Sequence, residues 1–184
     1  SSRLESGISY TEAAGGMMDA VEVVDVVLVR RAHAGAWARR LASALAGHEV
    51  EVGRHCPTCG SSEHGRAVVP GRPDVFVSLA YSGTRAVVAL ARVRVGVDVE
   101  PVGAADEAAL RAAGVESDTD PTRAWVAHEA TTKLAGTGLR HRAAPAVVHH
   151  LDAPGALLVA VATAVPVTVR LREEAGAPDD AATA

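Results

Sequence analysis

Residues 96–101 read Gly-Val-Asp-Val-Glu-Pro, an apolar run in which two acids stand two positions apart. The run predicts a strand, and successive side chains of a strand point to opposite faces, so Asp98 and Glu100 share one face. Pro101 has no backbone N–H and ends the run. Two carboxylates side by side repel each other, and taken alone such a strand end is more often a solvated face than a site.

A second segment, residues 121–135, predicts a helix that begins after Asp120 and ends at Gly136. Trp125, Glu129 and Lys133 recur in it at four-residue spacing and therefore share one stripe. Glu129 precedes Lys133 in the order that favours an ion pair along a helix. The helix therefore presents a carboxylate and an ammonium group together.

If this helix packs over the end of the strand, Asp98, Glu100 and Glu129 converge on one point. Three carboxylates suit a hard cation such as Mg2+, which keeps some water and accepts phosphate oxygens of a substrate. Lys133, the only lysine in the chain, would then flank those phosphates as a point charge. The two segments together predict a Mg2+-phosphate site.

Together the two segments resemble the paired motifs of the Sfp-type 4′-phosphopantetheinyl transferases, roughly G-[IV]-D-[IV]-E and W-x-x-K-E-A-x-x-K-x-x-G-x-G-[LI]. The resemblance covers about residues 23–171 and implies an α+β fold with two similar α/β halves related by a pseudo-twofold axis. We expect the halves at residues 21–92 and 93–172, after a flexible leader at 1–20 and before a disordered tail at 173–184.

The resemblance implies a transferase that moves the 4′-phosphopantetheine arm of coenzyme A to a serine of an acyl- or peptidyl-carrier protein. Such enzymes serve polyketide or nonribosomal peptide biosynthesis. Asp98, Glu100 and Glu129 would hold Mg2+, Glu129 would be the base for the serine hydroxyl, and Lys133 would stabilise the pyrophosphate. Asp98, Glu129 and Lys133 are thus the expected catalytic residues.

Coenzyme A contacts are expected from residues at the positions of the family's phosphate-binding segments and from a predicted helix at 34–46. They are Arg66, Tyr81, Ser82, His128 and Lys133, with Arg39 and Arg40 on the helix. The sequence departs from the family at several of these positions. Ala67 replaces a proline, Ala80 and Tyr81 replace a Ser-His pair, and His128 replaces a lysine whose charge is fixed at neutral pH.

These departures weaken the expected phosphate cradle while the acids persist. A second hypothesis is therefore a transferase-like protein recruited to another step, of cyclase or lyase type, on a polyketide or peptide intermediate. A third is a carrier-protein binder without enzymatic activity, which would tolerate loss of Asp98 or Glu129.

A Cys-x-x-Cys pair, Cys56 and Cys59, lies between His55 and His64. The pair could hold zinc or form a disulfide. A structural zinc site usually takes four protein ligands, and the chain has no other cysteine. Both alternatives stay open. The neighbours His149 and His150 point to opposite faces of a predicted strand, which disfavours a shared ion.

Composition excludes some classes of function. The chain has 184 residues, 48% of them hydrophobic and only 3% aromatic, and a formal net charge of −4. That charge offers no general attraction to nucleic acid or to an anionic membrane, and no apolar run is long enough to span one. We therefore expect a cytoplasmic monomer whose partners are coenzyme A and a carrier protein.

The rest of the chain predicts strands at residues 21–29, 75–83, 85–91, 146–151, 156–162 and 167–171 and a short helix at 104–112. The helix at 34–46 should bury Trp37, Leu41, Ala44 and Leu45 on one side.

Overall fold

The structure is a computed structural model that describes residues 21–117, 120–136, 146–174 and 176–178. The expected leader at 1–20 and the last residues of the expected tail, 179–184, lie outside this part of the chain. The strands are β1 (Val23–Arg30), β2 (Gly53–His55), β3 (Arg66–Val68), β4 (Phe76–Ser82), β5 (Arg85–Ala91), β6 (Val95–Pro101), β7 (Val147–Ala153), β8 (Leu157–Thr163) and β9 (Thr168–Glu173). The helices are α1 (Ala34–Ala46), preceded by a 3-10 turn at Arg31–His33, α2 (Glu107–Ala112) and α3 (Pro121–Ala135).

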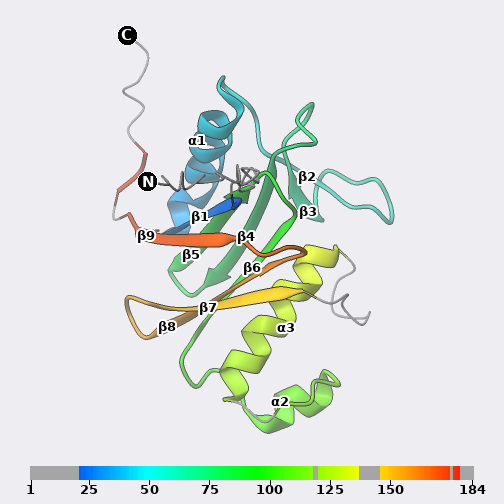
Figure 1. Cartoon of the computed structure of the whole chain (residues 1–184), viewed down its shortest axis with the longest axis vertical. Helices are drawn as coiled ribbons and strands as arrows, with labels where there is room; N and C mark the ends of the chain where they lie inside the picture. The colour runs from blue at the N-terminus through cyan, green and yellow to red at the C-terminus, as the bar shows by residue number, and fades with distance from the viewer. Residues whose placement is uncertain (1–20, 118–119, 137–145, 175, 179–184) are drawn as a thin grey trace, which may run out of the picture.

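The strands form two main sheets, so the predicted mixed α+β class is confirmed. One sheet has the order β4-β5-β1-β9, the other has the order β6-β8-β7, and β2 and β3 form a separate hairpin. Figure 1 shows α1 against the first sheet and α3 against the second. Each sheet thus has a helix of its own.

The two sheets share an apolar core. Buried residues of β1 and β5, such as Leu28 and Val87, belong to the same cluster as Val97 and Val99 of β6 and Val159 of β8. At the seam, the Val97 backbone N–H donates to the Ser78 hydroxyl oxygen at 3.0 Å. The contact places β6 of one sheet beside β4 of the other.

The last strand, β9, joins the sheet of the first half. It pairs in parallel with β1, with Val23 opposite Thr168. The first sheet therefore contains three strands from residues 21–92 and one strand, β9, from the expected second half. Trp37 Nε1 also donates to the Gly176 carbonyl at 3.0 Å. Gly176, which lies in the tail expected to be disordered from residue 173, is therefore in contact with α1.

The main helix predictions are confirmed, with two corrections. The bounds of α1 agree with the prediction, but Ala44 is exposed, and Ala34, Ala38 and Ala42 complete its buried face. Helix α2 begins at Glu107 rather than at 104, because the Asp106 carboxylate caps it by accepting from the Ala109 N–H at 2.8 Å.

Candidate functional site

Helix α3 lies directly on β6, and Gly96 makes this approach possible. A Cβ atom at Gly96 would lie 2.0 Å from the Ala130 carbonyl oxygen and 2.5 Å from the Leu134 nitrogen. No larger residue fits under the helix at this point without moving the backbone. The glycine of the opening motif therefore sets the distance between the strand and the helix.

The alternation of β6 then places its acids under the helix. Val97 and Val99 are fully buried in the core shared by the sheets. Asp98 and Glu100 lie on the opposite face, the face of Gly96 that meets α3. From the helix, Glu129 and Lys133 come toward the same place, one turn apart.

Lys133 forms the central ion pair of this group. Its Nζ lies 2.6 Å from Asp98 Oδ1 and 3.8 Å from Glu129 Oε2. Asp98 is only 4% exposed, and its second carboxylate oxygen, Oδ2, has no hydrogen-bond partner among the residues that the structure describes. A buried carboxylate oxygen without a partner is unusual and is suited to bind a cation or a ligand donor.

All three carboxyls are held in an environment that disfavours their charged form. Burial raises the pKa of Asp98, and the Lys133 ammonium opposes that shift. Burial raises the pKa of Glu100, to which the charges of Asp98 and Glu129 add. Burial and the charge of Asp98 likewise raise the pKa of Glu129. Three carboxyls share the single ammonium of Lys133, so ionisation of all three would leave negative charge that Lys133 does not compensate.

Replacing Glu100 with glutamine should raise the melting temperature, because glutamine removes the repulsion from Asp98 and Glu129. Solvent screens this partly exposed side chain, so the gain should be small, about 1–3 °C. Since the pKa of Glu100 is raised in the folded state, the gain should be present near neutral pH and disappear as pH falls through the folded-state pKa to the unfolded value of ~4.3.

Calorimetry across this pH range checks the prediction, with the exposed Glu116→Gln as the matched control. A lower melting temperature for Glu100→Gln at neutral pH would show that the carboxylate stabilises the fold, against the repulsion argued here.

The acids and Lys133 line one wall of a cavity of about 920 Å3. Other parts of its wall come from β4, which brings Tyr81, and from the β2–β3 hairpin, which brings Arg54 and Arg66. Arg94, directly before β6, also lines it. Arg66 reaches across toward the end of α3, where a Cβ at Gly136 would lie 3.7 Å from an Arg66 guanidinium nitrogen. The cavity thus combines a carboxylate wall with arginines.

The structure brings together some of the predicted contact residues and not others. Arg66, Tyr81 and Lys133 line the cavity with the acids, whereas Ser82, His128, Arg39 and Arg40 are not among the described lining residues. Arg39 lies 3.7 Å from Glu51, and the Arg40 guanidinium lies over the Trp37 ring. Both belong to α1, which covers the first sheet away from the acids (Figure 1).

His128 is next to the carboxylate group in sequence but not in the cavity. Its ring packs near Trp125, with ring centroids 6.2 Å apart. Its Nε2 is buried without a hydrogen-bond partner among the described residues. One residue along a helix turns a side chain by about 100°, so His128 leaves the face that Glu129 occupies.

Two further basic residues of the cavity, Arg54 and Arg94, were not predicted from the sequence. Arg94 precedes Gly96 and Asp98 at two-residue spacing, so strand alternation could have predicted that it lies on the same face as they do. Arg54 lies opposite Ala67 in the β2–β3 hairpin, next to Arg66. Its place depends on a hairpin with a loop of ten residues, 56–65, which the local pattern does not predict.

The donor set fits Mg2+ in its chemistry, although the three acids are not gathered around one point as tightly as expected. Among the described residues, the set of three or more possible metal ligands whose donor atoms all lie within 4.8 Å of one another is Cys56, Cys59 and His64. In the acid group, Lys133 takes the place beside Asp98. The partnerless Asp98 Oδ2 and the uncompensated negative charge are what a hard cation would satisfy.

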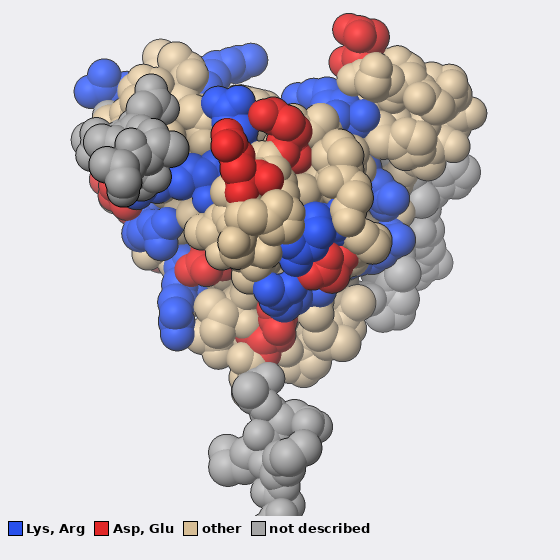
Figure 2. Space-filling view, turned by 90° about the horizontal axis from the view of Figure 1, so that it is seen from above, with Lys and Arg blue, Asp and Glu red and all other residues tan. Residues whose placement is uncertain are grey.

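No family model and no curated protein sequence matches this chain. Of the described helices, none has the length and apolar character needed to cross a membrane. Figure 2 shows that Lys and Arg side chains on one face of the molecule are interspersed with Asp and Glu side chains. This face therefore carries no field of a single sign.

Proposed function

We propose that this protein is a Mg2+-dependent 4′-phosphopantetheinyl transferase that acts on coenzyme A and an acyl- or peptidyl-carrier protein. The observation that carries the proposal is the cavity in which Asp98, Glu100, Glu129 and Lys133 face arginines. Carboxylates that hold a divalent cation and basic groups that hold phosphates are the two parts that phosphoryl transfer needs.

Each part has candidate residues in this chain. Asp98, Glu100 and Glu129 would hold Mg2+, which when bound neutralises pyrophosphate charge and polarises the phosphorus centre. Lys133 would bind a pyrophosphate oxygen as a point charge. Arg66 would bind phosphate through the planar fork of its guanidinium group.

The reaction breaks one phosphorus–oxygen bond and forms another. The hydroxyl oxygen of the carrier serine attacks the phosphorus that bears the pantetheine arm, and 3′,5′-adenosine bisphosphate leaves. Glu129 would accept the proton of that hydroxyl, because its carboxyl group lines the cavity beside Lys133. Little else is asked of the protein beyond positioning the two substrates.

The proposal extends to the fold and to the partner. Two sheets, each with a helix, that meet along β4 and β6 are compatible with two halves related by a pseudo-twofold axis. An acidic carrier protein would dock through local arginines at the cavity edge, since the face in Figure 2 is mixed in charge. We further propose that the chain acts as a monomer in the cytoplasm, in a polyketide or nonribosomal peptide pathway.

Incubation with an apo carrier protein, coenzyme A and Mg2+ tests the proposal directly. Mass spectrometry should detect one added phosphopantetheine arm on the carrier serine, and chelation of Mg2+ should abolish it. If no acyl- or peptidyl-carrier protein gains mass and calorimetry detects no binding of coenzyme A, the chain is not a transferase of this kind.

Replacing Arg66 with alanine should raise the KM for coenzyme A by ~10–100-fold with a smaller change in kcat, because one charged hydrogen bond to phosphate is lost. The matched control is Arg39→Ala on α1, whose side chain pairs with Glu51 away from the cavity. Steady-state kinetics with varied coenzyme A checks both. Equal effects of the two substitutions would remove Arg66 from the phosphate site.

A second candidate is an enzyme of cyclase or lyase type recruited to a biosynthetic intermediate. The ion pair of Lys133 with Asp98 at 2.6 Å favours it, because this pair needs no metal to be satisfied. Ala80 and Tyr81 on the cavity wall also lack the hydroxyl and imidazole of the transferase family. This candidate predicts activity that survives chelation and a coenzyme A affinity that rises when Ala80→Ser and Tyr81→His are combined.

A further inference from the structure

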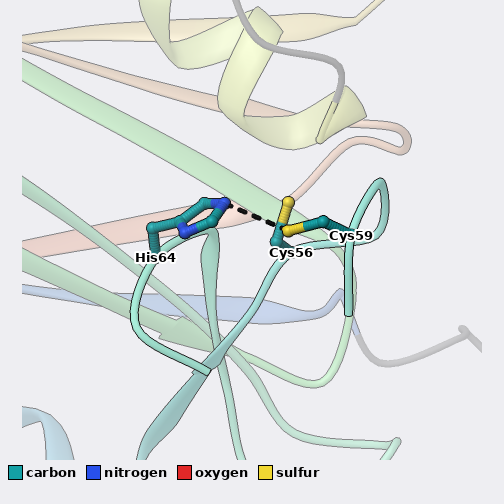
Figure 3. Close-up of side chains that lie close together, drawn as sticks. All are labelled: Cys56, Cys59 and His64. Atoms are coloured by element: carbon teal, nitrogen blue, oxygen red, sulfur yellow. Dashed lines mark hydrogen bonds between the residues drawn. The ribbon is translucent and has the colours of Figure 1, made fainter. Parts of the chain in front are cut away.

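A second cluster of reactive side chains lies in the loop between β2 and β3. The donor atoms of Cys56, Cys59 and His64 all lie within 4.8 Å of one another. Cys59 Sγ is 3.4 Å from His64 Nε2, and Figure 3 shows the imidazole pointing at the two sulfur atoms. Both cysteines are free thiols. None of these three residues takes part in a step of the proposed transfer reaction.

Backbone hydrogen bonds fold the chain after Cys56 into a tight turn that brings Cys59 back toward Cys56. The Gly60 N–H donates to the Cys56 carbonyl at 2.8 Å, and the Cys56 N–H donates to the Ser61 carbonyl at 2.9 Å. Gly60 has φ +73°, in the region that favours glycine.

A further glycine, Gly65, lets the chain bring His64 close to the two cysteines. Gly65 has φ +103°, and a Cβ there would lie 2.3 Å from the His55 carbonyl oxygen and 2.6 Å from the Cys56 nitrogen. The chain can pass this close to Cys56 only with glycine at position 65. His64 is therefore held beside the cysteine pair by the backbone path of the loop.

We propose that Cys56, Cys59 and His64 bind one Zn2+ ion, with water in the fourth position. Two thiolates and one imidazole are the donors that zinc prefers, and a tetrahedral site with Zn–S of about 2.3 Å and Zn–N of about 2.0 Å places its donors roughly 3.5–3.8 Å apart. The present spread of the donor atoms needs only small side-chain rotations to reach that geometry. A disulfide would leave His64 without a role.

The ion would fasten the loop that forms part of the cavity wall. Cys56 and Gly65 both line the cavity, and Arg54 donates to the Gly65 carbonyl at 3.1 Å. Arg66 follows Gly65 directly. Zinc at this point would therefore restrain the two arginines that enter the cavity from the hairpin. The site itself does not depend on the proposed transferase activity, because it is assigned from its own donors.

Metal analysis and cobalt spectroscopy of the whole chain test the site. Protein purified under reducing conditions with zinc should retain one zinc per chain. Co2+ added to the metal-free protein should show the visible bands of tetrahedral cobalt and the near-ultraviolet sulfur-to-cobalt charge-transfer band that requires thiolate ligands. Cys59→Ser and His64→Asn should each lose the metal, and the matched control His55→Asn, at the end of β2 directly before the loop, should keep it.

Several results would overturn the proposal. If the wild-type chain binds neither zinc nor cobalt although both thiols react freely, the site does not exist. This result needs no variant. A mass lower by two hydrogens under mild oxidation, with zinc binding absent after reduction, assigns the pair to a disulfide instead. Loss of metal in His55→Asn with retention in His64→Asn would show that the ligand set is a different one.

Discussion

Replacing Gly96 with alanine should lower the free energy of unfolding by about 3 kcal/mol or more, the largest stability effect that we expect from a single methyl group in this chain. The added Cβ would lie 2.0 Å from the Ala130 carbonyl oxygen and 2.5 Å from the Leu134 nitrogen. Both contacts are with backbone atoms, so no side-chain rotation relieves them. Helix α3 must move away from β6 and carry Glu129 and Lys133 with it.

Urea denaturation of the two proteins measures this effect. The matched control is Gly35→Ala in α1, where nothing lies within 4 Å of the new Cβ. Alanine is the better helix former, and this control should gain about 0.5–1 kcal/mol. If Gly96→Ala were as stable as the wild type, α3 would not rest on β6 as closely as described, and the proposed meeting of the acids would lose its basis.

Replacing Asp98 with asparagine should reduce the rate of carrier-protein loading by ~10³-fold or more, because the most buried of the proposed Mg2+ ligands loses its charge. Asparagine has nearly the same shape as aspartate, so the cavity should be preserved. The amide also removes the negative charge from the closest partner of the Lys133 ammonium, the Asp98 oxygen at 2.6 Å. The effect should therefore appear in kcat and in the Mg2+ concentration that gives half-maximal rate.

The matched control is Asp152→Asn, which alters an exposed ion pair to Arg123 at 3.4 Å and should leave loading unchanged. Mg2+ should also raise the melting temperature of the wild type, by mass action on the folded state, and should do so much less for Asp98→Asn. Undiminished loading by Asp98→Asn would remove the carboxylate from the reaction. If Mg2+ raised the melting temperature of Asp98→Asn as much as that of the wild type, Asp98 would not belong to the cation site.

Most of the secondary structure, apart from β2 and β3, and part of the candidate site could be predicted because they depend on local rules. Period-two alternation placed Asp98 and Glu100 on one face of β6, and four-residue spacing placed Glu129 and Lys133 on one stripe of α3. The side-chain cap at Asp120, which accepts from the Arg123 N–H at 3.0 Å, marked the start of α3. Each of these features involves residues fewer than ten positions apart.

The predicted residues that lie away from the cavity, and the tail residue that contacts α1, are residues whose surroundings come from distant parts of the chain. Arg39 and Arg40 were assigned to phosphates from their charge alone, yet α1 lies against the first sheet and points them elsewhere. His128 was assigned from the family motif, but its helical position turns it toward Trp125. The tail at Gly176 was expected to be disordered, and the Trp37 indole binds it.

The sequence by itself determined which residues could share a face, where most helices begin and end, and that the acids and the single lysine belong to two adjacent elements. Only the tertiary structure decided that Lys133 lies against Asp98, that β9 completes the first sheet beside β1, and that His64 returns to Cys56 and Cys59. The physical reason is that backbone periodicity is local. Long-range pairing is selected by how buried surfaces fit together, as at Gly96, where the absence of a side chain lets a helix rest on a strand.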